Sequence, residues 1–312
     1  MKIPIISFFS GCGGFDFGFT SVGFSVNLAL DVDSVAVNTY NHNIGMKICQ
    51  VADLANLKGN ELISLYEATS PKEPPKGVIG GAPCQTFSHS NVHFREDDNR
   101  HLLSRKYACL LRILNRKYNL DFFVFENVKG ITSYKHRKEY STIKRLFSTA
   151  GFRLFEGELD AQFFGVAQYR NRVFIVGINK EKYPKHTFYF PLPETKTALA
   201  VKDVIAELPE PYLYQRHTIK SEIPFHPNHW TMFPRSKKFY DGSLEAGSSK
   251  GRSFRVLNWN RPSWTVAYGN REVHVHPNGR RRLSVYEAMR LQGFSHSYEI
   301  LGTLSDQIRQ VS

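Results

Sequence analysis

The chain has 312 residues, of which 41% are hydrophobic, and its 41 lysines and arginines against 28 acidic residues give a formal net charge of +13. This length suits one large domain or two modest ones, and none of the apolar runs is long enough to cross a membrane. The four cysteines have neither disulfide-like nor metal-like spacing, which indicates a reducing, intracellular compartment. The positive charge suggests an anionic partner, but a basic surface without one explains it equally well.

Strand-like and helix-like segments alternate through the first 178 residues. The predicted strands are Ile3–Phe9, Val26–Asp31, Lys47–Asp53, Gly77–Gly80, Asp121–Phe125, Phe152–Leu159 and Arg172–Ile178. The predicted helices are Phe15–Gly23, Val35–His42, Asn60–Ala68, Tyr107–Tyr118 and Tyr140–Ala150. This alternation predicts an α/β fold with a mainly parallel, doubly wound sheet, whose ligands bind at the carboxyl ends of the strands.

The pattern changes after Gly177. From Pro184 to Trp264, prolines, aromatic and basic residues follow one another without a clear period, which predicts a smaller region of irregular loops and short strands. Residues 183–282 hold 16 Lys/Arg against 8 Asp/Glu, so they carry +8 of the net charge of +13. A helix is expected at Ser284–Gln292, because Ser284 and Glu287 have the spacing of a capping box.

The segment Gly80–Gln85 reads GGAPCQ and follows a short apolar run. A cysteine at the end of a buried strand can be held still and still face a substrate. Pro83 fixes its own φ and biases Ala82 toward an extended conformation, so the backbone aims the thiol of Cys84. A nucleophilic thiol and an inert buried thiol are the two interpretations.

The segment Phe8–Phe15 reads FFSGCGGF and joins the first predicted strand to the first predicted helix. Its three glycines let backbone N–H groups approach a ligand, and the helix N-terminus favours a negative group. Asp31 and Asp53, at the ends of the next two strands, could bind ribose hydroxyls and an adenine amine. A tight turn without a ligand and two ordinary turn or cap carboxylates are the alternatives.

The segment Phe122–Val128 reads FFVFENV and places Glu126 at the end of an apolar strand, where its carboxyl could hold or donate a proton. A helix cap or an ion pair is the alternative. In the segment QYRNR, Arg170 and Arg172 are two residues apart in a strand-like stretch, so we expect them on the same face. Such a pair can bind a carbonyl, a carboxylate or a phosphate, and a surface salt-bridge pair is the alternative.

In this order, these segments resemble the motif set of the cytosine-C5 DNA methyltransferases of bacterial restriction–modification systems or phages. The resemblance runs from Ile5 to the last residue, except for the variable middle. Further matches are Arg261–Val266 (RPSWTV), Arg281–Ser284 (RRLS) and Leu291–Phe294 (LQGF). It implies a Rossmann-like catalytic and cofactor-binding domain at 1–178, a target-recognition region at 179–260, and a return to the catalytic domain at 261–312.

The resemblance implies sequence-specific transfer of a methyl group from S-adenosylmethionine to carbon 5 of cytosine in duplex DNA, leaving S-adenosylhomocysteine. The family flips the target base out of the duplex. Cys84 would attack carbon 6 of the ring, which makes carbon 5 nucleophilic. Glu126 would bind the ring N3 and the exocyclic amine, while Arg172, and less directly Arg170, would hold the ring carbonyl.

The resemblance also implies the binding residues. For the cofactor these are Phe9, Ser10, Gly11, Cys12, Gly13, Gly14, Asp31, Val32, Asp53, Leu54 and Pro83. For DNA they are Gln85, Ser88, Arg95, Arg235, Lys237, Lys238, Arg252 and Arg255. The stretch Thr86–Ser104 is expected to form a mobile lid over the DNA, with a solvated charged loop as the alternative. No metal is expected, because no thiols flank the pairs His226/His229 and His274/His276.

The family closes with a Gly-Asn-Ala-Val-Pro-like segment and a helix that packs on the sheet, and this chain reaches Ser312 where that segment should start. A shortened sequence, a second subunit carrying the missing piece and a defective enzyme are the three explanations. We therefore expect the chain alone to be poorly stable and to bind its cofactor weakly. Expected partners are double-stranded DNA, a restriction endonuclease acting on the same site and that second subunit, in the cytoplasm at the nucleoid.

Two other functions stay open at this point. A branch of the same family methylates tRNA, so the motifs alone do not exclude a tRNA cytosine-C5 methyltransferase. A DNA-binding chain that is inactive without the C-terminal motif is the other alternative. The length and basic character of residues 179–260 favour DNA as the substrate.

Overall fold

The structure is a computed structural model that describes residues 2–69, 73–83, 101–194, 197–215, 220–250, 254–265 and 274–311. The chain folds into two compact units. The first comprises Met1–Leu159 and Asn171–Pro191, and the second comprises Asp160–Arg170 and Leu192–Ser312. The chain therefore passes between the two units three times.

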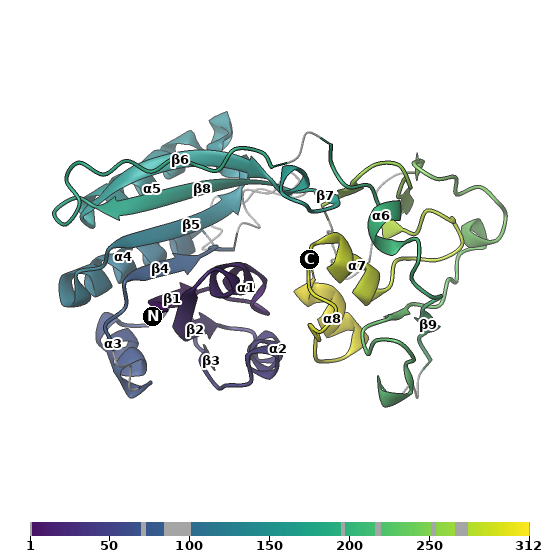
Figure 1. Cartoon of the computed structure of the whole chain (residues 1–312), viewed down its shortest axis with the longest axis horizontal. Helices are drawn as coiled ribbons and strands as arrows, with labels where there is room; N and C mark the ends of the chain where they lie inside the picture. The colour runs from purple at the N-terminus through teal and green to yellow at the C-terminus, as the bar shows by residue number, and fades with distance from the viewer. Residues whose placement is uncertain are drawn as a thin grey trace. The chain divides into compact units, whose positions relative to one another are not determined.

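A seven-stranded sheet with the order β3-β2-β1-β4-β5-β8-β6 forms the first unit (Figure 1). The strands are β1 (Ile3–Phe8), β2 (Phe24–Asp31), β3 (Cys49–Val51), β4 (Gly77–Gly80), β5 (Phe122–Val128), β6 (Phe152–Asp160) and β8 (Asn171–Asn179). The first five pair in parallel, whereas β8 runs antiparallel to β5. The beginning of β8 therefore lies beside the carboxyl end of β5, with Arg172 opposite Val128.

Helices cover both faces of this sheet. On one face, α3 (Gly59–Ala68), α4 (His101–Tyr118) and α5 (Arg137–Thr149) share a hydrophobic core with the strands. On the other face, α1 (Gly14–Ser21) and α2 (Ser34–Ile44) pack against β1, β2 and β3. Alternate residues of one strand enter opposite cores, as with Phe123 and Val124 of β5. The predicted α/β class with a mainly parallel, doubly wound sheet is confirmed.

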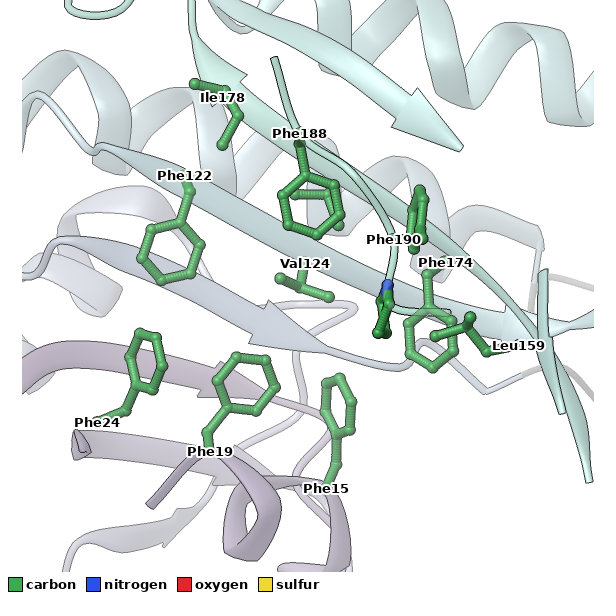
Figure 2. Close-up of a pocket in the computed structure, with 12 residues that line it drawn as sticks. Phe15, Phe19, Phe24, Phe122, Val124, Leu159, Phe174, Ile178, Phe188 and Phe190 are labelled. Atoms are coloured by element: carbon green, nitrogen blue, oxygen red, sulfur yellow. The ribbon is translucent and has the colours of Figure 1, made fainter. Parts of the chain in front are cut away.

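Part of the second face is an apolar pocket of about 400 Å³ (Figure 2). Side chains from α1, β2, β5 and β8 and from the segment after β8 point into it. Its lining residues are Phe15, Phe19, Phe24, Phe122, Val124, Leu159, Phe174, Val176, Ile178, Phe188, Phe190 and Pro191. We call this set the apolar face.

The second unit is built from short elements. Its strands are β7 (Gln168–Tyr169), β9 (Tyr212–Leu213), β10 (Trp230–Thr231), β11 (Ser249–Lys250), β12 (Phe254–Val256), β13 (Ser263–Trp264) and β14 (His274–Val275). Its α-helices are α6 (Lys202–Ile205), α7 (Val285–Leu291) and α8 (Leu304–Gln310). β13 pairs in parallel with β7, which joins segments almost a hundred positions apart in the sequence. The predicted capping box is confirmed, because Ser284 Oγ accepts from the Glu287 N–H while Glu287 accepts from the Ser284 N–H.

A buried ion pair lies beneath this helix start. Arg281 donates to both carboxylate oxygens of Glu287 at 2.9 and 2.8 Å, and Glu287 is 1% exposed. Its carboxylate therefore stabilises the capped end of α7 and the buried guanidinium at the same time. Removing Arg281 leaves the Glu287 carboxylate without its cation in the interior, which is costly, whereas Arg281 also pairs with Glu210 at 2.7 Å.

Candidate active site

The proposed nucleophile loop begins directly after β4. Ala82 is buried, and its carbonyl accepts a hydrogen bond at 3.2 Å from Nδ2 of Asn127 in β5. Pro83 is exposed. Cys84 lies outside the described residues, as do the predicted DNA-binding residues Gln85, Ser88, Arg95 and Arg252.

The expected lid at Thr86–Ser104 falls mostly outside the described residues as well. Its last part is described, because α4 begins at His101. Residues 101–104 are thus the first turn of a helix and not part of a loop. The sequence missed this turn because its apolar spacing becomes clear only from Tyr107 onward.

Glu126 and Arg172 meet at the carboxyl end of the sheet. Glu126 Oε1 lies 2.8 Å from Arg172 Nε, and the two side chains are 22% and 15% exposed. The antiparallel pairing of β5 with β8 brings them together, because it puts the start of one strand beside the end of the other. The ion pair considered for Glu126 is therefore present, and it lies where a ligand of the sheet is expected.

The backbone of the nucleophile loop approaches this pair closely. A Cβ built on Gly81 would lie 2.6 Å from Glu126 Oε2, closer than side-chain atoms can approach. Only glycine fits at this position unless the carboxylate shifts. Glu126, Arg172 and the residues that lead into Cys84 thus form one compact site within the first unit.

The expectation that Arg170 and Arg172 share one face of a strand is wrong. β7 ends at Tyr169 and β8 begins at Asn171, so Arg170 lies in neither strand. Its backbone N–H donates at 3.0 Å to the carboxylate of Asp160, which also accepts from Gln162. These hydrogen bonds hold Arg170 in the second unit, whereas Arg172 belongs to the first.

The glycine turn between β1 and α1 is tightly wound. Phe9, Gly11 and Gly13 have φ values of 55°, 52° and 94°. Phe9 is not glycine, so its left-handed conformation costs on the order of 1–2 kcal/mol, and such strain is concentrated at functional sites. A Cβ built on Gly11 meets no atom within 4 Å, so one side of the turn is open to a ligand.

Asp31, the last residue of β2, fastens this turn. Its Oδ2 accepts from the Gly11 N–H at 2.8 Å, and its Oδ1 accepts from the Asp33 N–H at 2.9 Å. Each carboxylate oxygen keeps a further lone pair that can accept from a hydroxyl. The neighbouring Val32 is 65% exposed. These residues fit the ribose of an adenosyl cofactor bound against the turn.

The other predicted cofactor residues have different environments. Gly14 begins α1, and Ser10 is buried with its Oγ 3.3 Å from the sulfur of Cys49. Asp53 is exposed and accepts from Ala55 N–H and Asn56 Nδ2. These bonds are those of a turn carboxylate, which the sequence analysis gave as the alternative for this residue.

Two more of these side chains are buried. Leu54 packs in the hydrophobic core. Burial raises the pKa of the Cys12 thiol to about 11, so it stays protonated and is a poor nucleophile. Both side chains therefore lie in the interior.

Two residues near the site received no role from the sequence. Asn127 links β5 to the nucleophile loop through its hydrogen bond to Ala82. It follows Glu126 directly in the strand, so the two side chains point to opposite faces of the sheet. Asp16 of α1 is 1% exposed and accepts from Ser7 Oγ at 2.7 Å and Tyr40 OH at 2.8 Å. Burial raises the pKa of Asp16 to about 7. In the sequence, the signal that could have revealed Asp16 is a carboxylate on the side of the predicted helix that faces the sheet.

The predicted DNA-binding cations of the second unit lie at its surface. Arg235, Lys237 and Arg255 are exposed, and Lys238 Nζ lies 4.6 Å from the centre of the Phe254 ring. Two large aromatic side chains of the same region, Phe233 and Tyr240, are 57% and 65% exposed.

The histidine pairs are structural where the structure describes them. His229 has ring nitrogens 3.0 Å from Ser284 Oγ and 2.6 Å from the Pro209 carbonyl oxygen. Burial lowers the pKa of His226 and of His274 to about 4. Among the described residues, no group of three His, Cys, Asp or Glu could hold a metal ion. Nor does any helix in that part of the chain have the length and apolarity needed to cross a membrane.

A family model described as C-5 cytosine-specific DNA methylase matches residues 3–312. The chain belongs to the C-5 cytosine-specific DNA methylase family. It is therefore a DNA cytosine-5-methyltransferase, and the resemblance drawn from its motifs is confirmed.

Two relatives show how far the similarity extends. The Type II methyltransferase M.MthTI of Methanothermobacter thermautotrophicus is 32% identical over 96% of this chain and 88% of its own length. M.NmeDI of Neisseria meningitidis serogroup C, also a Type II methyltransferase, is 30% identical over 99% of this chain and 80% of its own length.

Solved structures share the fold of this methyltransferase. A protein encoded in an E. coli prophage and described as a DNA modification methyltransferase superposes with a TM-score of 0.78 at 22% identity, covering 99% of this chain and 94% of that one. The S. pombe Dnmt2 methyltransferase superposes with a TM-score of 0.65 at 17% identity, covering 99% and 93%.

Proposed function

We propose that this methyltransferase modifies cytosine within a specific duplex sequence, with Cys84 as the nucleophile and S-adenosylmethionine as the methyl donor. The observation that carries this proposal is the Glu126–Arg172 pair, which lies against the backbone of Gly81 three residues before Cys84. A carboxylate and a guanidinium at that point can bind the polar edge of a cytosine while a thiol attacks the ring.

The reaction begins with a base that has left the duplex, at an unstacking cost of a few kcal/mol. The Cys84 thiolate forms a bond to carbon 6, and the electron pair of the ring double bond moves to make carbon 5 nucleophilic. Glu126 donates a proton to N3 and accepts from the exocyclic amine, which offsets the negative charge that develops on the ring. Arg172 holds Glu126 in place, and its other N–H donors suit the ring carbonyl. Once carbon 5 carries the methyl group, loss of its proton to a base restores the ring double bond and expels the Cys84 sulfur as a thiolate.

The glycine turn and Asp31 would hold the cofactor. Backbone N–H groups at the start of α1 suit its carboxylate, and Asp31 suits its ribose hydroxyls. S-adenosylmethionine supplies the methyl group when it is bound there. The role of this part of the chain is to orient that group toward carbon 5 and to exclude water.

Recognition of the DNA sequence is assigned to residues 179–260. Arg235, Lys237, Lys238 and Arg255 supply cations on an exposed surface that also carries aromatic side chains. Relatives named Type II methyltransferases support a cognate restriction endonuclease that acts on the same site. The enzyme would then work in the cytoplasm, in contact with the nucleoid.

We further propose that an apolar helix from a second polypeptide covers the apolar face. Mainly parallel sheets have both faces covered, and α1 and α2 leave part of this face open (Figure 2). M.MthTI and M.NmeDI have residues outside the region that matches this chain. A polypeptide with those M.MthTI residues should raise the thermal stability of the chain and its affinity for cofactor. A Phe174→Ser/Phe190→Ser variant should show neither gain, and no gain in the unaltered chain would contradict the proposal.

Methyl transfer from labelled S-adenosylmethionine tests the main proposal. Mixed-sequence duplex DNA and tRNA are supplied separately, beside a Cys84→Ser variant. Incorporation into DNA that disappears in the variant supports the proposed function, and mapping the modified cytosines gives the specificity. Incorporation into tRNA alone would contradict it. A duplex with 5-fluorocytosine should trap a denaturation-resistant adduct, which a chain that only binds DNA cannot form.

A further inference from the structure

A basic segment follows the candidate active site along the chain. Residues 129–138 read KGITSYKHRK, with four lysines and arginines, one histidine and no acidic residue. They form two short 3₁₀ turns, Lys129–Thr132 and Tyr134–His136, and the start of α5. We call Lys129, Tyr134, Lys135, Arg137 and Lys138 the basic ridge.

Buried residues anchor this segment to the first unit. Gly130 and Ile131 are buried, and His136 is 7% exposed. The Ser133 N–H donates to the Gly130 carbonyl at 3.1 Å, and the His136 N–H donates to the Ser133 carbonyl at 3.0 Å. The side chains of the basic ridge are all exposed, so they are presented from an ordered backbone. A ligand that binds them does not have to order the segment first.

The basic ridge also carries an aromatic side chain. Tyr134 is 84% exposed, and the guanidinium carbon of Arg137 lies 4.9 Å from the centre of its ring. The exposed tyrosine ring therefore carries a cation over one of its faces. Such a surface suits a sugar–phosphate backbone, to which tyrosine and arginine both donate hydrogen bonds.

Two acidic residues close to the basic ridge, Glu158 and Glu139, each pair with a cation. Lys129 Nζ lies 2.7 Å from Glu158, so this lysine is partly neutralised. The next acidic residue in the sequence, Glu139, pairs with Arg105. Residues 129–138 hold four cations and no acidic residue, so this surface keeps an excess of positive charge.

We propose that the basic ridge binds the phosphate backbone of the DNA strand beside the flipped cytosine. The proposal rests on the proposed function and adds a DNA contact outside the recognition region. Lys129 follows Glu126 by three residues, at the carboxyl end of β5 where the base would be bound. A flipped nucleotide pulls its own backbone toward the pocket, and cations at this position would offset part of the unstacking cost.

The salt dependence of DNA binding tests this proposal. Each phosphate contact contributes about 0.9 to the slope of log affinity against log salt concentration. Lys135→Ala/Lys138→Ala should lower that slope by about 1 to 2 and weaken binding to all duplex sequences alike. Lys135→Arg/Lys138→Arg should keep the slope of the unaltered chain.

A matched pair of cations lies at the other end of the sheet. Arg116 and Lys117 are exposed at the end of α4, just before the amino end of β5. Arg116→Ala/Lys117→Ala should leave the slope unchanged. Equal slopes for the unaltered chain and for the Lys135/Lys138 alanine variant, or equal losses in both alanine variants, would overturn the proposal.

Tyr134 gives a second measurement. Tyr134→Phe keeps the ring and loses only the hydroxyl donor, whereas Tyr134→Ala loses both, so Tyr134→Ala should bind duplex DNA several-fold more weakly than Tyr134→Phe. Equal binding by the two variants would show that the ring does not contribute to DNA binding. All of these measurements need DNA binding only. If the chain binds DNA without methylating it, the proposed function is contradicted, but the basic ridge can still be tested.

Discussion

Arg172 Nε lies 2.8 Å from the Glu126 carboxylate because β8 runs antiparallel to β5. Had β8 been parallel, the start of that strand would lie at the opposite edge of the sheet. The pair therefore depends on one reversed strand in an otherwise parallel neighbourhood. Each side chain limits the movement of the other, so we expect changes in either one to affect turnover more than stability.

Glu126→Gln removes the carboxyl group and keeps nearly the same shape. Turnover should fall by about 10²- to 10⁴-fold, because the amide cannot transfer a proton to N3 as negative charge develops on the ring. Glu67→Gln, at an exposed carboxylate that pairs with Lys117, is the matched control and should leave turnover unchanged. Near-normal methyl transfer by Glu126→Gln would exclude this role for Glu126.

Arg172→Lys keeps the positive charge and loses the planar group. A lysine cannot orient Glu126 through Nε and bind the ring carbonyl at once, so turnover should fall at least tenfold with little change in melting temperature. Arg145→Lys, at an exposed position of α5, serves as the control. Full activity in Arg172→Lys would mean that charge alone suffices.

Gly81→Ala introduces a Cβ that would lie 2.6 Å from Glu126 Oε2. The carboxylate must then move, and a displacement of about 1 Å in an active site can cost about 10²-fold in rate. The chain should stay folded, which near-unchanged circular dichroism would show. Gly18→Ala, where a Cβ meets no atom within 4 Å, should keep its activity.

Asp16 should make stability depend on pH. Burial raises its pKa to about 7 in the folded chain, above the usual value of about 3.9. The folded chain then binds this proton more tightly than the unfolded chain, so the contribution is complete below about pH 4 and is lost as pH rises to about 7.

Urea unfolding at pH 4.5 to 8 checks this prediction. Across that range, the free energy of unfolding should decline more steeply for the unaltered chain than for Asp16→Asn, whose side chain does not titrate. Parallel curves for the two proteins would show that Asp16 does not titrate in this window.

The buried pair of Arg281 and Glu287 should matter for stability. Arg281→Met leaves the carboxylate of Glu287 unpaired and should cost about 3–5 kcal/mol in the free energy of unfolding. Adding Glu287→Leu should recover part of this loss, but not the bond that Glu287 accepts from the Ser284 N–H. Chemical denaturation of the two single variants and the double variant measures the coupling, and additive losses would exclude it.

Much of the first unit could be predicted from the sequence, because its strands are continuous apolar runs separated by turn residues. Gly77–Gly80 is a strand with the predicted bounds, and α5 and α2 begin within three residues of their predicted starts. Bounds were less accurate where a strand continues past its apolar residues. β5 includes Glu126 and runs to Val128, because its pairing with β8 continues through those polar positions.

The active site could be predicted only as a set of residue types. Strand order, and the direction of β8 above all, decides which side chains meet, and neither follows from local patterns. The break at Arg170 was missed because it arises from hydrogen bonds to Asp160, ten residues earlier in the sequence. Local sequence patterns could not predict the open side of the apolar face either, because residues such as Phe24 and Phe174 come from separate strands.

The pairing of β7 with β13 has a consequence for how specificity can evolve. Gln168 and Ser263 are neighbours in a parallel β pair, so both ends of the long excursion between them are held together. Residues 192–262, which follow β8 inside the excursion, can lengthen, shorten or be exchanged without moving those ends, and each doubling of a loop costs only about 0.6 kcal/mol. Grafts whose junctions lie after β8 and before β13 should therefore acquire new target sequences while the chemistry, Arg172 included, is inherited unchanged.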